Sequence, residues 1–303
     1  MKRLLKKTAR CALAALCACF VWPAQSVHAD DGVTGFDAML GIFESLSALP
    51  LEERDAAGAS LMQAVQSVER LRSRASSISG GRPFSEDVLE RRGLNAQAGE
   101  SIDGFIYGQA GYPQAALLIG SAGNGREHGC GPIAAFNALI LLSRRGMAGL
   151  PGIPEMPRIE DIIAGIEIMG GFTNSGLMGT NPQVLAQYLG GLGLDARVSY
   201  LPAGMDGQIR ESLGGAAILL YLGRAAGGGT YWHYVAAAYS GGGFELYNVG
   251  ARDTAPRAFA SVDEWMERTA AGAALALVTF AHPGTGAPGI GVSPTTNART
   301  AHR

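Results

Sequence analysis

The feature that most constrains this chain is a helix-length apolar run that follows a cysteine between two glycines. Residues 133–142 read Ile-Ala-Ala-Phe-Asn-Ala-Leu-Ile-Leu-Leu, with one polar side chain in ten. A helix that is apolar on nearly every side is stable only when it is buried on nearly every side. The rest of the chain therefore has to surround this helix.

The composition agrees with a globular protein. Apolar residues make up 47% of the 303 residues and charged residues 17%. That apolar share excludes a generally disordered chain, which lacks the apolar surface for a core. The formal net charge of −2 gives no support for a nucleic-acid partner, because such proteins carry clustered positive charge.

The first 29 residues have the pattern of a secretory signal peptide. Five cationic residues precede the 12-residue apolar run Cys11–Trp22, which is too short to span a bilayer, and the small residue Ala29 marks a cleavage site. We expect residues 1–29 to be removed and the protein to be secreted or held in the cell envelope. An alternative interpretation takes Leu16–Cys19 as a lipoprotein box in which Cys19 is acylated. No later segment predicts a membrane span.

Removal of this segment leaves Cys130 as the sole cysteine and leaves no lysine. With its five cations gone from the 24 and all 26 acidic residues kept, the net charge becomes about −7. A single cysteine excludes an internal disulfide. Without lysine, Schiff-base chemistry and a Walker-type phosphate loop are excluded, because both need the amine.

Hydrophobic periodicity divides the mature chain into a helical part, a mixed part and a tail. Residues 30–110 predict a helical N-terminal region, either an extension of the main domain or a prodomain. Residues 111–283 predict further helices at Ile159–Met169 and Asn181–Gly190. The strands expected in the same part are Ala196–Leu201, Ala217–Leu222, Tyr231–Tyr239, Phe244–Val249 and Leu275–Ala281. Helices followed by a run of strands favour an α+β fold with an antiparallel sheet. Residues 284–303, rich in Gly, Pro, Thr and Ser, predict a disordered tail.

Cys130 has the surroundings of a reactive thiol. It lies at the start of the buried helix, between Gly129 and Gly131, with Pro132 in the first turn, where proline is tolerated. The free amides and the positive dipole end of a helix N-terminus favour a thiolate. The same amides can stabilise an oxyanion. We therefore interpret Cys130 as a nucleophile rather than as a small buried apolar residue.

A nucleophilic cysteine needs a base, and His233 is the strongest candidate. It lies near the start of the strand-like segment Tyr231–Tyr239. His128 is only two residues from the cysteine, which makes an in-line ion pair awkward. His282 ends the last expected strand, and His302 lies in the tail.

Asn248 is the candidate that orients His233. The glycines at 241–243 predict a hairpin that brings Asn248, on the next strand, within a few residues of direct opposition to the histidine. A side-chain amide at this position can accept from one ring nitrogen and leave the other facing the thiol. Asp253 and Asp195 are weaker substitutes.

These residues together resemble the papain-like cysteine peptidases, in particular the bacterial bacteriocin-leader-processing type. The resemblance rests on Cys130-Gly131-Pro132 before an alanine-rich helix, on the distant His233 and on a polar residue in the following strand, and it covers about residues 115–282. It implies a papain-like fold with a helical half that bears the cysteine, a sheet half that bears the histidine, and a cleft between them. It also implies hydrolysis of a peptide or protein substrate through a thioester, without metal or cofactor.

The resemblance also implies a side chain that donates to the oxyanion. In that family this is commonly a glutamine six residues before the cysteine, and the residue at that place here is Asn124, one methylene shorter. Gln109 and Gln114 are alternative donors that depend on how the loop folds.

Other functions compete with this interpretation. The same residues suit a papain-like deamidase or acyl transferase acting on protein side chains, and the fold also suits a non-catalytic binding module. The glycines at 120, 123 and 125 do not match the spacing of a dinucleotide-binding turn. His128 with Cys130 supplies only two of the four ligands of a zinc site. We therefore expect neither a cofactor nor a metal.

Overall fold

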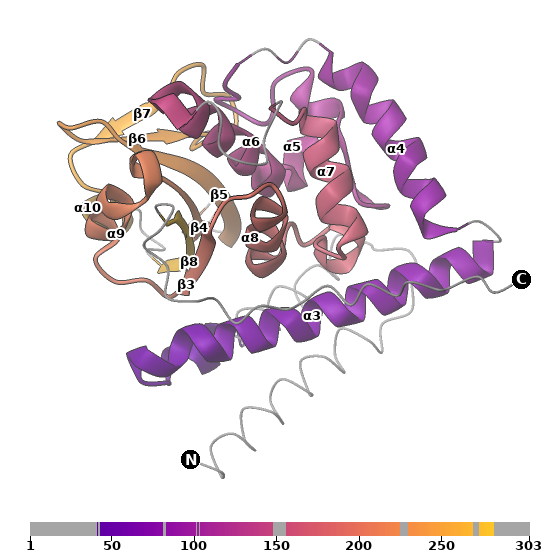
Figure 1. Cartoon of the computed structure of the whole chain (residues 1–303), viewed down its shortest axis with the longest axis horizontal. Helices are drawn as coiled ribbons and strands as arrows, with labels where there is room; N and C mark the ends of the chain where they lie inside the picture. Colours follow the sequence, from indigo (N-terminus) through magenta and orange to yellow (C-terminus); the bar gives the residue numbers. More distant parts are fainter. Residues whose placement is uncertain are drawn as a thin grey trace, which may run out of the picture.

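The computed structural model describes residues 41, 43–80, 83–100, 102, 104–147, 156–224, 230–268 and 273–281. In these ranges most helices precede most strands (Figure 1). The α-helices are α3 Leu51–Gly80, α4 Phe84–Gly99, α5 Gly125–His128, α6 Cys130–Leu142, α7 Ile159–Ile168, α8 Pro182–Gly191, α9 Met205–Glu211 and α10 Val262–Arg268. The strands are β1 Leu118–Ile119, β2 Gly123–Asn124, β3 Ala196–Tyr200, β4 Ala216–Arg224, β5 Thr230–Tyr239, β6 Phe244–Tyr247, β7 Arg257–Phe259 and β8 Ala273–Phe280.

Six of the strands form one antiparallel sheet in the order β3-β8-β4-β5-β6-β7. β4 and β5 pair along nearly their whole length, from Ala216 opposite Ala238 to Arg224 opposite Thr230. β6 is shorter, and on β5 it pairs only with the last four residues, from Ala236 opposite Tyr247 to Tyr239 opposite Phe244. The first half of β5 is therefore left as an edge on the β6 side.

Helices cover both faces of this sheet. On one face α6 packs against β4 and β5, and α7 and α8 pack against α6; on the other face lie α9 and α10 (Figure 1). Side chains along β5 alternate between the two: Tyr234 and Ala236 join the core around α6, whereas Val235 and Ala237 join the core under α9 and α10. Every residue from Cys130 to Leu142 is buried, so the enclosed helix that the apolar run predicted is confirmed.

The N-terminal helices share the core of the mixed part. Met62 of α3 is fully buried in the same apolar cluster as α6. Asn181 Nδ2 donates to the carbonyl oxygen of Met62 at 2.8 Å, and the amide of Tyr200 donates to Asp55 Oδ1 at 2.7 Å. A helical turn at residues 43–47 precedes α3.

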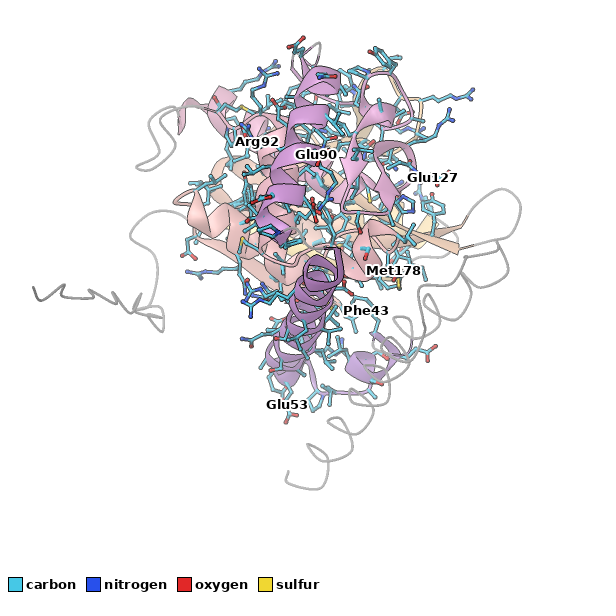
Figure 2. The ribbon with its side chains drawn as sticks, turned by 90° about the vertical axis from the view of Figure 1, so that its right-hand side faces the viewer. Phe43, Glu53, Glu90, Arg92, Glu127 and Met178 are labelled. Atoms are coloured by element: carbon cyan, nitrogen blue, oxygen red, sulfur yellow. The ribbon has the colours of Figure 1, made fainter. Side chains whose placement is uncertain are left out.

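That turn also packs against the sheet. Phe43 points towards the body of the molecule, whereas Glu53 of α3 points away from it (Figure 2). The ring of Phe43 meets the ring of Trp232 in β5 edge to face, with centroids 5.8 Å apart. Trp232 lies on the same strand as His233, one residue before it.

The structure confirms much of the expected α+β arrangement. The five expected strands end within two residues of β3, β4, β5, β6 and β8. Asn181 caps α8: its Oδ1 accepts from the amide of Gln183 at 2.9 Å. The short elements α9, α10 and β7 were not predicted.

Several expectations lie outside the described residues. These are the signal peptide at 1–29, the alternative acylation of Cys19, the residues His282 and His302, and the tail at 284–303. Within the described ranges, no helix is long and apolar enough to cross a membrane.

Candidate active site

Cys130 is the first residue of α6, and only 6% of its surface is exposed. Burial raises the pKa of its thiol to about 11, against the opposing effect of the backbone amides of Tyr234, Gly131 and Cys130 itself. At neutral pH the thiol is therefore protonated in this closed state. A Cβ at Gly131 would collide with Thr180 Oγ1, so glycine is what allows the segment before α8 to approach the helix start.

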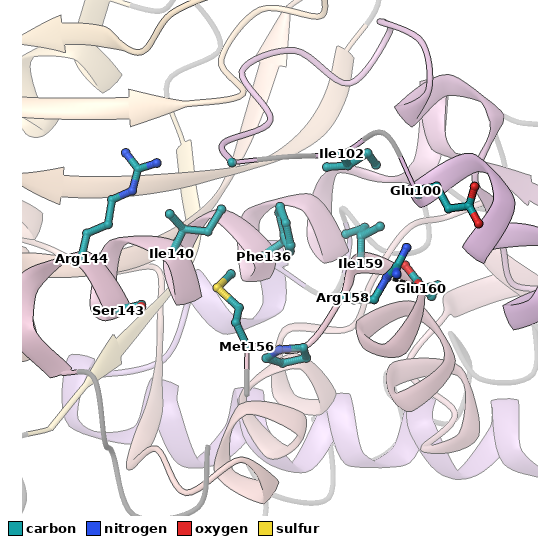
Figure 3. Close-up of a pocket in the computed structure, with 13 residues that line it drawn as sticks. Glu100, Ile102, Phe136, Ile140, Ser143, Arg144, Met156, Arg158, Ile159 and Glu160 are labelled. Atoms are coloured by element: carbon teal, nitrogen blue, oxygen red, sulfur yellow. Dashed lines mark ion pairs between the residues drawn. The ribbon is translucent and has the colours of Figure 1, made fainter. Parts of the chain in front are cut away.

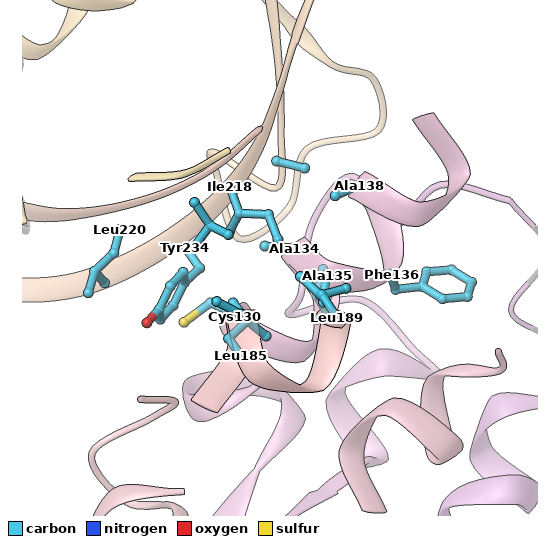
Figure 4. Close-up of a cluster of buried hydrophobic side chains, with 14 of the residues drawn as sticks. Cys130, Ala134, Ala135, Phe136, Ala138, Leu185, Leu189, Ile218, Leu220 and Tyr234 are labelled. Atoms are coloured by element: carbon cyan, nitrogen blue, oxygen red, sulfur yellow. The ribbon is translucent and has the colours of Figure 1, made fainter. Parts of the chain in front are cut away.

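The thiol lies at the open edge of β5. Tyr234, whose amide faces the sulfur, lies two residues before Ala236, where the pairing with β6 ends. Cys130 lies beside Tyr234 in Figure 4, and the hydroxyl of that tyrosine donates to the carbonyl oxygen of Thr180 at 2.8 Å. The start of α6, the edge of β5 and the segment before α8 thus meet at the sulfur.

His233 reaches the same edge from the other face of the sheet. It lies directly opposite Tyr221 in β4, and the two rings meet edge to face with centroids 5.7 Å apart. The imidazole Nε2 is in hydrogen-bond contact with the main-chain oxygen of Asn248, just beyond the end of β6. Because a carbonyl oxygen only accepts, Nε2 carries the ring proton, and Nδ1 is the nitrogen that can accept one.

The imidazole is neutral at rest. His233 is buried, and burial lowers its pKa, with smaller opposing contributions from the hydrogen bond to Asn248 and from the charge of Asp253. Thiol and ring are therefore both uncharged in the closed site. Among the described residues, no hydrogen bond joins Cys130 to His233. The sulfur of Cys130 faces the amide of Tyr234, and the ring of His233 packs on Tyr221, so the two groups do not form an ion pair in this structure.

The expectation that the side-chain amide of Asn248 holds the ring was wrong. Asn248 has a left-handed backbone, with φ of 66°, and is 1% exposed. Its Oδ1 accepts from the backbone amide of Gln109 at 2.9 Å, and its Nδ2 donates to Gln109 Oε1 at 3.1 Å. The side chain is thus committed to Gln109, and the main-chain carbonyl is the group that meets His233.

The expected oxyanion donor is also committed elsewhere. Asn124 is the N-cap of α5: its Oδ1 accepts from the amide of Glu127 at 3.0 Å, and its Nδ2 lies 3.4 Å from Glu127 Oε2. Gln109 is buried and donates to the carbonyl oxygen of Arg126 at 2.9 Å, so it links Asn248 to the turn before the cysteine. Gln114 begins a short 3-10 turn.

The weaker candidates fall into different places. His128 accepts a hydrogen bond on Nδ1 from a backbone amide 3.2 Å away in its own turn. Asp253 pairs with Arg257 at 2.8 Å and lies close enough to His233 to affect its pKa. Asp195 lies at the surface in a pair with its neighbour on β3, at 2.7 Å. Asp253 is thus the carboxylate that acts on the ring through its charge.

Sequence reasoning missed two residues of this cluster. Tyr221 packs on the ring of His233, and the charge of an ionised Cys130 is among the causes that raise its pKa. Thr180 packs on Gly131, and its buried Oγ1 has no hydrogen-bond partner among the described residues. The signal for Tyr221 was the register of the β4–β5 hairpin.

The described residues contain no group of three His, Cys, Asp or Glu side chains that could hold a metal ion. Comparisons of the chain with protein-family models, with curated proteins and with solved structures found no match. The function therefore has to be inferred from the residues and contacts of this chain.

Proposed function

We propose that this protein is a secreted cysteine peptidase in which Cys130 is the nucleophile and His233 the general base. A papain-like architecture for residues 111–283 and export directed by residues 1–29 belong to the same proposal. One observation carries it: the one cysteine after residue 29 begins a buried helix and faces the amide of the residue that follows the candidate base. The expected substrate is a peptide or protein.

The proposed reaction uses the thiol of Cys130 and the imidazole of His233. Nδ1 of His233 takes the thiol proton, and the sulfur of Cys130 adds to the carbonyl carbon of the substrate. The amide at the helix start stabilises the oxyanion. The imidazolium then returns the proton to the leaving nitrogen as the C–N bond breaks. Water, deprotonated by the same ring, hydrolyses the thioester and frees the thiol.

Asn248 and Gln109 act in this scheme as positioning residues. The main-chain carbonyl of Asn248 holds Nε2–H and thereby fixes the tautomer that leaves Nδ1 free. Gln109 holds the side chain of Asn248 through two hydrogen bonds. The carbonyl therefore has a fixed direction.

The test is hydrolysis of a mixture of unfolded proteins, with products analysed by mass spectrometry. Cys130→Ala is expected to abolish cleavage, and His233→Ala to lower the rate about a thousandfold, as expected for loss of a general base. His128→Ala is the matched control, because it removes the neighbouring histidine, and it should keep most of the activity. Cleavage that survives Cys130→Ala contradicts the proposal. Conversion of side-chain amides to acids without chain cleavage favours the deamidase alternative instead.

A second pair of variants tests the role of the carbonyl. Asn248→Gly keeps the main-chain carbonyl and adopts the left-handed φ freely, whereas Asn248→Ala keeps the carbonyl at a cost of about 1 kcal/mol in backbone strain. Both variants lose the amide contacts with Gln109. We expect kcat/KM to fall less in Asn248→Gly than in Asn248→Ala. Equal losses in the two variants would assign the function to the side chain.

A further inference from the structure

A cavity of about 650 Å³ lies along the C-terminal half of α6, away from Cys130 (Figure 3). It is bounded by the end of α4, the start of α7 and one face of α6. Its apolar lining comes from Ile102, Phe136, Ile140, Met156 and Ile159. This volume is in the range of pockets that hold small ligands.

One end of the cavity is a buried carboxylate. Glu160, in the first turn of α7, is 3% exposed, and its Oε1 pairs with Arg158 at 2.5 Å. Its Oε2 is buried and has no hydrogen-bond partner among the described residues. Glu100, an exposed residue, lines the same end of the cavity (Figure 3). A buried acceptor without a partner is costly, and a charged donor is the partner that stabilises it most.

The other end of the cavity carries a cation. Arg144 is exposed, and its guanidinium lies over the ring of Phe105, with Cζ 4.4 Å from the centroid. Arg144 lines the cavity, and the structure gives it no ion pair among the described residues. Phe136 and Ile140 of α6 and Arg144 of the π-helical turn that follows it (Ser143–Met147) are spaced by four residues, so this wall of the cavity runs for about 12 Å up to the arginine.

We propose that this cavity binds a short apolar peptide with free ends, the ammonium on Glu160 and the carboxylate near Arg144. The two ends supply opposite charges, and the wall between them supplies apolar contact. The wall from Phe136 to Arg144, about 12 Å long, matches three or four extended residues at about 3.3 Å each. The inference does not rest on the proposed peptidase activity, because the cavity does not include Cys130 or His233.

The test is titration calorimetry of the full-length chain with the tetrapeptide Ala-Leu-Leu-Ala. Wild type and Cys130→Ala are both titrated, so that any hydrolysis is separated from binding. Acetylation of the peptide's amino end is expected to weaken binding about tenfold or more, the loss of one charged hydrogen bond. Amidation of its carboxyl end is expected to weaken binding less, about threefold, because Arg144 is exposed.

Variants assign each peptide end to its residue. Glu160→Gln should bind the free and the acetylated peptide equally, and Arg144→Gln should bind the free and the amidated peptide equally. Arg197→Gln, an exposed arginine on β3, is the matched control and should bind as wild type does. Gly99→Ala also tests the Glu160 end of the cavity. A Cβ at residue 99 would lie 2.8 Å from Glu160 Oε2 and take the place of the ammonium.

Three results would overturn the inference. One is the absence of measurable binding by wild type up to about 1 mM peptide. Another is equal affinity of wild type for the free and the acetylated peptide. The third is free-peptide binding by Gly99→Ala at wild-type strength. A peptidase assay that fails while calorimetry succeeds would refute the proposed function and leave this inference standing.

Discussion

The two ends of α6 are built in opposite ways. At its start, the polar groups that matter for chemistry are almost all paired: the sulfur of Cys130 faces backbone amides, Nε2 of His233 meets a carbonyl, and Asn248 is bonded to Gln109. At its other end lies a cavity with an unpartnered carboxylate oxygen on Glu160. At the start of α6 the only unpartnered buried oxygen among the described residues is the hydroxyl of Thr180, whereas at the other end it is an oxygen of a carboxylate.

The two ends of α6 are proposed to do different things: the start carries the candidate catalytic groups, and the other end holds the candidate peptide-binding cavity. Burial at the start of α6 raises the pKa of the thiol and lowers that of the imidazole, so the candidate catalytic groups rest uncharged. A proton can move between them only when the edge of β5 opens or a substrate takes the place of its present contacts. The cavity at the other end is already present in the structure. The following predictions test whether the two ends are independent.

Asn137 lies between the two ends, and its loss should disturb both. It is fully buried on α6, accepts from the amide of Ile106 at 2.9 Å and donates to the carbonyl of Ile106 at 2.7 Å. Asn137→Ala leaves both backbone groups buried without a partner, and we expect the free energy of unfolding to fall by about 4 kcal/mol. Urea denaturation measures this, with Ser143→Ala, an exposed change on the next turn, as the control. A loss below about 1 kcal/mol would show that Ile106 finds other partners.

The buried thiol of Cys130 should make the folded protein less stable at alkaline pH. The thiol of Cys130 has a pKa of about 11 in the folded protein against about 9 when unfolded, so the unfolded chain loses its proton first. Between pH 9 and 11 the unfolded state therefore binds fewer protons, and stability falls as pH rises, by up to about 3 kcal/mol from this group.

Comparison with Cys130→Ala isolates this contribution. Ionisation of buried tyrosines such as Tyr221 also lowers stability in base, and burial, the largest cause of the shift of Tyr221, acts in both chains, whereas the smaller contribution from the charge of Cys130 is present in the wild type alone. The difference in unfolding free energy between the two chains should therefore shrink from pH 9 to pH 11. A constant difference over that range would mean that the thiol is more open than its 6% exposure indicates.

Two buried carboxylates on α7 should respond differently to the same change. Glu167 pairs with Arg91 of α4 at 2.5 Å, and the arginine is 18% exposed. Glu160 pairs with an arginine that is 55% exposed and has one oxygen unpartnered within the described residues. We expect Glu167→Gln to cost about 2 kcal/mol and Glu160→Gln less than about 1 kcal/mol, measured by urea denaturation. The reverse order would mean that Glu160 holds the fold rather than a ligand.

Much of the fold was predictable because its signals are local. The apolar run at 133–142 required a surrounding core, and period-two segments located five strands to within two residues. The helix expected at Asn181–Gly190 is α8, which begins at Pro182 with Asn181 as its N-cap, a position that favours asparagine. The short helices α9 and α10 lacked such a signal, since seven residues hold fewer than two full repeats.

Within the candidate site, the contact between His233 and Asn248 was predictable to the residue but not to the atom. Hairpin spacing brought Asn248 near His233, and the main-chain carbonyl is the group in contact. A left-handed φ at one residue decides this, and nothing in the residue type distinguishes it from an extended one. The partner of the side chain, Gln109, is 139 positions away, beyond the reach of local patterns. Likewise, whether Asn124 donates to an oxyanion or caps α5 depended on a helix of four residues.

The prediction with the smallest expected effect concerns a contact that keeps the thiol of Cys130 buried. Phe43 packs edge to face on Trp232, on the strand that carries His233 and at the face where α6 lies. Phe43→Leu keeps an apolar side chain but removes this ring contact, which is worth about 1 kcal/mol. If opening of the edge breaks that contact, the rate of Cys130 alkylation by iodoacetamide should rise about fivefold.

The same variant separates the two ends of α6. Binding of Ala-Leu-Leu-Ala should be unchanged in Phe43→Leu, because Phe43 does not line the cavity. Leu51→Ala is the control, since Leu51 is 59% exposed at the start of α3 and should alter neither alkylation nor binding. Unchanged alkylation in Phe43→Leu would mean that the thiol is reached without moving the N-terminal turn. A parallel change in alkylation and in peptide binding would mean that opening at the start of α6 is transmitted along the helix. The two sites would then be coupled.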